Sequence, residues 1–164
     1  MKRENWLNPA EIKRLLAVAE DMNVQRSGRP EAFLLQYIAW EALKVRILIA
    51  GMVHKGLTVK DAKKILKTEQ VWNQGNYKRV FKKYFGSYPS NAKGMGKYFN
   101  AGEELDRLRH AFVHGTSRVD PESYRKASSK LIEIFGADWG GLVSGVLKSS
   151  KPIDPMNRIH RIKR

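Results

Sequence analysis

Apolar residues recur every three or four positions along most of this chain, which is the spacing of an α-helix. The first such segment opens with Asn8 and Pro9, a typical helix start, and its apolar positions follow at helical spacing: Ile12, Leu15, Leu16 and Ala19. Comparable patterns predict further helices over residues 30–52, 58–67, 69–86, 97–113, 121–136 and 137–150. No segment alternates as a strand does, and no internal repeat is found. We therefore predict an all-α protein, an up-and-down bundle of about four core helices with short accessory helices.

The 164 residues correspond to about one domain, which we place at residues 1–150. Its fourth helix, 69–86, is expected to bury one broad apolar face: Val71, Trp72, Val80, Phe81 and Phe85. Segment 86–97, GSYPSNAKGMGK, is rich in Gly, Ser and Pro and is predicted to be a loop. Residues 151–164 contain two prolines, and four of the last seven residues are Lys or Arg. We expect this basic C-terminal arm to be extended or flexible, and either to wrap RNA or simply to be solvated.

Charge is the strongest global feature of the chain, because 31 Lys and Arg are present with only 16 Asp and Glu, a net charge of +15. Such a surface attracts polyanions, so nucleic acid is the expected partner, with a generally basic soluble protein as the alternative. Cysteine is absent, which excludes disulfides and thiolate metal sites and is typical of a reducing compartment. The N-terminus turns polar at once, without the apolar run of a secretory signal, so we expect a cytoplasmic protein.

The most apolar segment, 32–53, does not resemble a membrane span. It carries Glu41, Lys44 and Arg46 near its centre, where each lipid-facing charge would cost about 2.5–3.5 kcal/mol. We therefore expect a buried helix and no membrane contact. Glu41 itself needs a partner, and it is expected either to orient Arg109 or His114 or to pair with Lys44 or Arg46.

The stretch RLRHAFVHG, residues 107–115, places charged groups at the end of a helix that must be partly buried. One sector of the helix is apolar and is expected to face the core: Tyr98, Ala101, Leu105, Leu108 and Phe112. At about 100° per residue, Arg109 lies at the border of this sector, while His110 and His114 lie nearly opposite. Both histidines are therefore predicted to point away from the core, and Gly115 is expected to end the helix.

Three interpretations of this cluster are open. Two exposed histidines at a helix C-terminus favour the negative end of its dipole and need no further role. Alternatively, Asp106, His110 and His114 are spaced by four and present a carboxylate and two imidazoles as metal ligands. No glutamate stands between the histidines as a general base and no fourth ligand is evident, so we predict no metal and no cofactor.

The third interpretation is RNA cleavage without a metal, by Arg109 and His114 acting together. The ribose 2′-OH supplies the nucleophile, so the protein needs only an acid–base group and a phosphate clamp. Imidazole contributes about 10²- to 10⁴-fold by proton transfer, and guanidinium grips the phosphate and its added charge in the transition state.

The sequence RHAFVH, Arg109 to His114, with His110 as the polar neighbour of the arginine, resembles the motif of the HEPN superfamily (higher eukaryotes and prokaryotes nucleotide-binding). The long helix containing WEALKVR and a helix after the motif resemble the core of that family, so the likeness covers about residues 10–150. The resemblance implies an endoribonuclease, as a toxin or antiviral defence effector, or a non-catalytic RNA- or nucleotide-binding or dimerisation module. It also implies a homodimer whose two Arg–His motifs form a composite site, and an antitoxin or partner protein as a restraint.

One branch of the family carries a Tyr two residues after the histidine, but here His114 is followed by Gly115 and Thr116. Nucleotide modification of such a tyrosine is therefore not expected. A lysine-rich face on the third and fourth helices is a further expected RNA track. The tyrosines interleaved with it, Tyr77, Tyr84 and Tyr88, are expected either to stack bases or to lie in the core.

Overall fold

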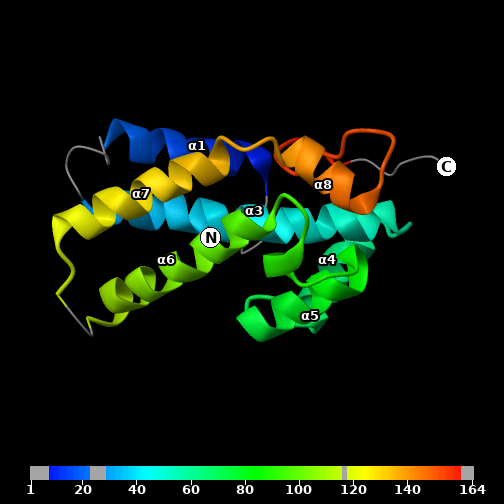
Figure 1. The fold of residues 1–164 in the computed structure, drawn as a ribbon, viewed down its shortest axis with the longest axis horizontal. Coiled ribbons are helices and arrows are strands. Elements are labelled where there is room, and N and C mark those ends of the chain that lie inside the picture. Colours follow the sequence, from blue (N-terminus) through cyan, green and yellow to red (C-terminus); the bar gives the residue numbers. More distant parts are fainter. Residues whose placement is uncertain (1–7, 23–28, 116–117, 160–164) are drawn as a thin grey trace. The chain divides into compact units, whose positions relative to one another are not determined.

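The computed structural model describes residues 8–22, 29–115 and 118–159, and all regular structure in these ranges is helical (Figure 1). The described residues form seven α-helices and one 3₁₀ turn: α1 Pro9–Asp21, α3 Pro30–His54, α4 Val59–Thr68, α5 Gln74–Phe85, η2 Pro89–Asn91, α6 Gly96–His114, α7 Pro121–Phe135 and α8 Trp139–Leu147. The all-α prediction is confirmed. Among these helices none combines the length and the apolar composition that a membrane span requires.

Side-chain caps explain why the helices begin where they do. The side-chain oxygen of Asn8 accepts a hydrogen bond from the Ala10 N–H at the start of α1, and Thr58 accepts one from the Asp61 N–H at the start of α4. Each bond satisfies a backbone donor that has no partner within the helix. At the other end of α5, Gly86 adopts a left-handed conformation with φ of 81° and stops the helix.

The chain divides into two compact units. The first unit contains residues up to 42 and residues 98–137, and it therefore includes α1, the first half of α3, most of α6 and α7. The second unit contains residues 43–97 and those from 138 onward, with the second half of α3, α4, α5 and α8.

Aromatic side chains fill the core of the first unit. The Phe33 ring on α3 lies 5.6 Å from the Tyr124 ring on α7, and the Trp40 ring lies 5.6 Å from that of Phe99 on α6, between centroids. Phe33 and Trp40 are at most 1% exposed. These contacts hold α3 against both α6 and α7.

In the second unit, α5 packs its aromatic side closely against α3. The Phe81 and Phe85 rings stack with centroids 4.2 Å apart, and Phe85 lies so close to Gly51 that a Cβ there would be 2.4 Å from the ring. Trp72, however, is 49% exposed, so the prediction that it joins the apolar face is wrong. It lies in the turn before α5, where the helical period does not apply.

The described part of the C-terminal arm, residues 151–159, is irregular and lies against the second unit. Ile153 and Pro155 are buried. The guanidinium of Arg46, itself 7% exposed on α3, donates hydrogen bonds to the backbone carbonyls of Pro155 and Asn157. Burial lowers the pKa of Arg46 to about 10, against the opposing effect of the Asp154 charge. Residues 160–164 of the arm lie outside the described residues.

Candidate functional site

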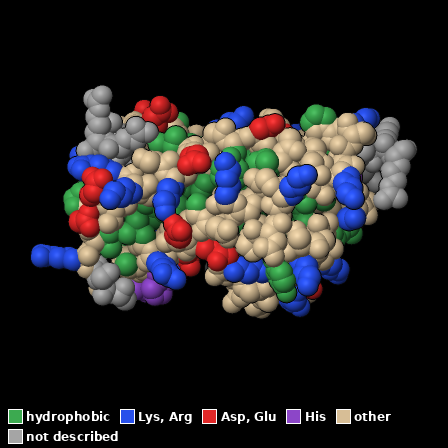
Figure 2. Space-filling model, viewed as in Figure 1, with side chains coloured by type: hydrophobic (Ala, Val, Ile, Leu, Met, Phe, Trp, Pro, Cys, Tyr) green, Lys and Arg blue, Asp and Glu red, His purple; other side chains and the backbone are tan. Residues whose placement is uncertain are grey.

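The last turn of α6 presents two imidazoles at the surface. His110 and His114 are both exposed, and their ring centroids lie 4.2 Å apart with the planes tilted by 45°. Histidine side chains are visible at the surface of the space-filling view (Figure 2). Gly115, with φ of 59°, ends the helix directly after His114. The predictions that both histidines point away from the core and that Gly115 stops the helix are confirmed.

Arg109 is half-buried and lies on a tyrosine of α3. Its guanidinium carbon is 5.9 Å from the centroid of the Tyr37 ring, within the range of a cation–π contact. The Tyr37 side chain is 5% exposed, and its hydroxyl donates a 2.7 Å hydrogen bond to a carboxylate oxygen of Asp106, one turn before Arg109. The Tyr37 ring therefore supports the Arg109 guanidinium, and its hydrogen bond to Asp106 fixes the ring in place.

The Tyr37 hydroxyl is held in its protonated form. Burial raises its pKa well above the ordinary value, and the negative charges of Glu41 and Asp106 raise it further. A phenol in this state serves as a hydrogen-bond donor and not as an acid near neutral pH. Glu41, one turn along α3 from Tyr37, thus acts on the same group that supports Arg109.

The buried face of α6 is turned relative to the predicted one. Of the five apolar residues expected in the core only Leu105 is buried; the other four are half-buried, whereas Phe99 and Gly102 are buried. At about 100° per residue, the centre of the buried face moves by about 80°, towards Gly102. A Cβ at Gly102 would lie 2.4 Å from Trp40 Nε1, so the missing side chain lets the indole pack directly on the backbone. The same rotation brings Asp106 and Arg109 towards Tyr37.

Within one chain, Arg109 and His114 belong to different groups. They are five positions apart in the sequence, which in a helix is about 7.5 Å along the axis and about 140° around it. Among the described residues, no hydrogen bond or ring contact joins Arg109 to either histidine. Arg109 is thus grouped with Tyr37 and Asp106, and His114 with His110.

A metal site at this helix end would require Asp106, His110 and His114 to converge on one ion. The Asp106 carboxylate accepts a hydrogen bond from the Tyr37 hydroxyl, while the rings of His110 and His114 lie 4.2 Å apart. Over the ranges that the structure describes, no three His, Asp or Glu side chains are placed to share a metal ion.

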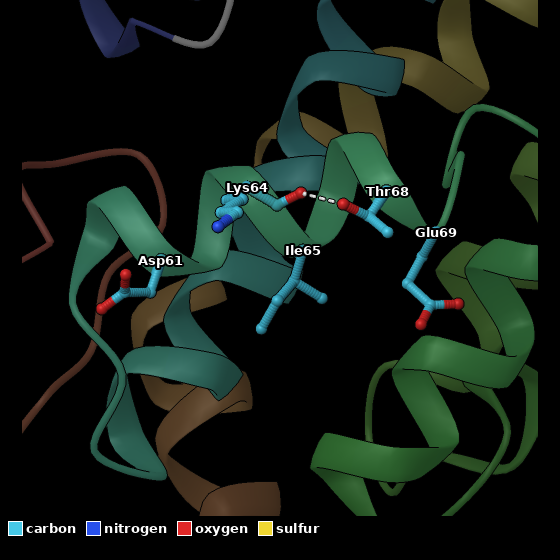
Figure 3. A pocket seen from close by; sticks show the side chains of 5 residues that line it. All are labelled: Asp61, Lys64, Ile65, Thr68 and Glu69. Carbon is cyan, nitrogen blue, oxygen red and sulfur yellow. Dashed lines mark hydrogen bonds between the residues drawn. The ribbon is translucent and has the colours of Figure 1, made fainter.

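A hollow of about 330 Å³ lies on α4 and is the second place where a small ligand could be sought (Figure 3). Asp61 accepts the Thr58 hydroxyl, Thr68 donates to the Lys64 carbonyl, and Glu69 pairs with Arg79. Asp61, Thr68 and Glu69 in its wall are therefore already engaged by other groups of the protein. Two carboxylates in its wall also oppose a phosphate ligand, so we do not place the chemistry there.

Comparisons with known proteins add no family. No protein-family model matches the sequence, and no curated protein or solved structure is significantly similar to it.

Proposed function

We propose that this chain is a metal-independent endoribonuclease of the HEPN type. His114 is the acid–base group, Arg109 is the phosphate clamp and His110 is the supporting polar group. The observation that carries the proposal is the end of α6, where two adjacent exposed imidazoles follow an arginine that is supported by Tyr37. The net charge of +15 is a second support, because the substrate is a polyanion.

In the proposed reaction, His114 takes the proton of a ribose 2′-OH while that oxygen attacks the adjacent phosphorus. A P–O2′ bond forms, the P–O5′ bond breaks, and the products are a 2′,3′-cyclic phosphate and a 5′-hydroxyl end. The leaving 5′ oxygen takes a proton from a second imidazole in its protonated form, and supplying this proton is the supporting role of His110, whose ring lies 4.2 Å from that of His114. Arg109 neutralises the charge that builds on the phosphate oxygens.

We place the complete site between two copies of the chain. Arg109 and His114 diverge by about 140° around α6, so one helix does not direct both at the same phosphate. A twofold axis near the helix end would bring one protomer's Arg109 towards the partner's His114. Val113, between the two histidines in sequence, is 51% exposed and offers an apolar contact for such a twin.

The biological role that we propose follows the HEPN resemblance: a cytoplasmic toxin or antiviral effector, restrained by an antitoxin or another partner protein. A nuclease that cleaves cellular RNA without a metal requires such a restraint in the cell. Growth of cells that express the wild-type chain or His114→Ala measures this role, since only the wild type should stall growth.

Cleavage of mixed RNA in EDTA tests the activity. The wild type should produce fragments with 2′,3′-cyclic phosphate ends, and His114→Ala should lose about 10²- to 10⁴-fold in rate with its circular dichroism unchanged. His54→Ala, which removes an imidazole from the end of α3, is the matched control and should cleave like the wild type. Cleavage that appears only when a divalent metal is added would reject the mechanism.

Mixing inactive subunits tests the composite site. If each site takes Arg109 from one chain and His114 from the other, a heterodimer of Arg109→Ala and His114→Ala contains one intact site. An equimolar, fully exchanged mixture should then recover about a quarter of the wild-type activity. No recovery, with heterodimers shown by native mass spectrometry, would place both residues in the same subunit's site.

The second candidate is a non-catalytic HEPN-like module that dimerises and holds RNA or a nucleotide. The observation that favours it is the same divergence of Arg109 and His114, because phosphate binding by Arg109 alone needs no nearby imidazole. It predicts salt-sensitive RNA binding without products, weakened by Arg109→Ala and unaffected by His114→Ala.

A further inference from the structure

Helices α4 and α5 of the second unit form a strongly cationic surface. Residues 59–88 contain eight Lys or Arg and two acidic residues, Asp61 and Glu69. The Asp61 carboxylate accepts a hydrogen bond from the Thr58 hydroxyl at 2.6 Å, and Glu69 forms an ion pair with Arg79 at 2.7 Å. Both acids belong to α4 and its C-cap, whereas α5 contains four Lys or Arg and no acidic residue, so a phosphate on α5 meets cations alone.

On α5 the cations and the core residues occupy opposite sides. At about 100° per residue, the four cations span a sector of about 140°. These four residues, which we call the α5 basic face, are Lys78, Arg79, Lys82 and Lys83. The opposite sector holds the buried residues: Tyr77, Val80, Phe81, Tyr84 and Phe85. Lys and Arg side chains gather over α5 near the lower edge of the space-filling view (Figure 2).

The structure separates the three tyrosines of this region. Tyr77 is 5% exposed and donates its hydroxyl proton to the Lys44 carbonyl, and Tyr84 is 9% exposed, so both belong to the core. Tyr88 is 45% exposed. The Lys82 ammonium lies 4.6 Å from the centroid of the Tyr88 ring, so the exposed aromatic adjoins the α5 basic face.

The backbone holds Tyr88 in place. It caps the η2 turn, and Pro89, the next residue, is buried. A ring that is exposed on a fixed backbone offers a flat apolar surface at low entropic cost.

We propose that the α5 basic face and the Tyr88 ring bind single-stranded RNA, with phosphates at Lys82 and Lys83 and an unpaired base stacked on Tyr88. Cations beside an exposed aromatic ring suit a single strand, because every base has a face that can stack on the ring. A duplex keeps its bases inside its own stack and would use only the lysines. The choice of RNA over DNA rests on the proposed function, whereas the test below does not require cleavage.

The expected effects follow from the two kinds of contact. Loss of one stacked base weakens binding by about 5- to 150-fold, and an exposed ring should lie near the lower end. Each lost phosphate contact to a single strand reduces the slope of log K against log salt by about 0.7.

The test uses a fluorescent single-stranded 2′-O-methyl RNA, which has no free 2′-OH and cannot be cleaved by the proposed route. Anisotropy titrations in EDTA at several salt concentrations compare the full chain with four variants: Tyr88→Ala, Tyr88→Phe, Lys82→Ala and Lys126→Ala. The last removes an exposed lysine of α7 in the first unit and is the control for charge.

We expect Tyr88→Ala to bind at least about fivefold more weakly and Tyr88→Phe to bind like the wild type. Lys82→Ala should lower the salt slope, and Lys126→Ala should not. Equal binding by Tyr88→Ala and the wild type would overturn the proposal. Equal competition by a duplex of the same length, or by polyglutamate, would also overturn it, because it would show attraction by charge alone. If the proposed nuclease activity is wrong, the cleavage assay shows this, whereas the binding titrations remain valid because they require no cleavage.

Discussion

Replacing Gly102 with Ala tests the close approach that sets the rotation of α6. Gly102 is buried in the middle of the helix, and a Cβ added to it would lie 2.4 Å, 2.8 Å and 2.9 Å from three atoms of the Trp40 indole. Trp40 is 1% exposed, so the ring has no solvent-filled space into which it can move. We therefore expect Gly102→Ala to destabilise the protein, against the usual preference of helices for alanine.

Two opposing effects give the magnitude. Alanine in place of a helical glycine normally stabilises by about 0.5–1 kcal/mol. Forcing an extra methyl into a packed core costs about 1–3 kcal/mol, and contact with three ring atoms favours the upper part of this range. The net loss should be about 1–2 kcal/mol, which for a chain of this size lowers the melting temperature by about 2–8 °C.

The assay is urea unfolding followed by circular dichroism, with Gly145→Ala as the matched control. Gly145 also lies within a helix, α8, but a Cβ there would meet nothing within 4 Å. Gly145→Ala should therefore stabilise by about 0.5–1 kcal/mol. The two Gly→Ala variants are thus expected to differ in sign.

A double-mutant cycle with Trp40→Phe identifies the partner of the clash. The smaller ring should relieve part of the cost, so Gly102→Ala should be less harmful in the Trp40→Phe background by at least about 0.5 kcal/mol. If Gly102→Ala stabilised the protein as Gly145→Ala does, the direct packing of α6 on the indole would be refuted, and with it the rotation that brings Arg109 to Tyr37.

Three further predictions concern the Tyr37–Asp106 hydrogen bond, the end of α6 and the start of α7. Tyr37→Phe keeps the ring but removes the hydroxyl that donates a hydrogen bond to Asp106, and should lower the free energy of unfolding by about 1–2 kcal/mol and lower the cleavage rate. If both values were unchanged, Tyr37 would not support Arg109. Gly115→Ala should destabilise by about 1 kcal/mol because φ is 59° there, whereas Gly115→Asn should be milder since Asn tolerates this conformation, and equal melting temperatures would count against the strain. Hydrogen bonds from Ser123, first from its backbone N–H and second from its hydroxyl, lower the pKa of Asp120. The stabilisation by Asp120 is therefore present above the unfolded pKa of this group and is lost as the pH falls through the lower folded pKa. Asp120→Asn should flatten that part of the acid denaturation curve.

Most of the fold could be predicted because its signals are local. Helix starts are encoded by neighbouring residues, as Asn8 with Pro9 and Thr58 show, and the helical period follows from the apolar positions between them. The error at Trp72 has the same origin. Trp72 lies in the turn before α5, where the backbone does not repeat with the helical period, so its direction does not follow from the spacing of the apolar residues around it.

The candidate site was only partly accessible from the sequence. The outward direction of His110 and His114 follows from their places on one helix and is confirmed. The support of Arg109 does not follow in this way, because Tyr37 and Asp106 are 69 residues apart and only tertiary packing joins them. Gly102 carried a usable signal, since a glycine within a strongly helical segment often marks a close approach.

A helical projection predicts the burial of the tyrosines within α5 but not the exposure of Tyr88, which lies outside that helix. Tyr77 and Tyr84 share the sector of Val80, Phe81 and Phe85, so their burial follows from the period of α5. Tyr88 lies beyond the end of that helix, where no period applies. Its exposure is a property of the folded turn.

The way in which Arg46 holds the C-terminal arm has a consequence for how this protein can change over time. The guanidinium donates hydrogen bonds to main-chain oxygens, which every amino acid possesses. These bonds therefore do not depend on the side chains of residues 155 and 157. Substitutions at the exposed positions of residues 151–159 can therefore accumulate while the attachment to Arg46 persists, whereas Ile153 and Pro155 are constrained by their burial. Related proteins should then keep an arginine at the position of Arg46, while the sequence of the segment that it binds varies. A comparison of sequences alone would align that segment poorly.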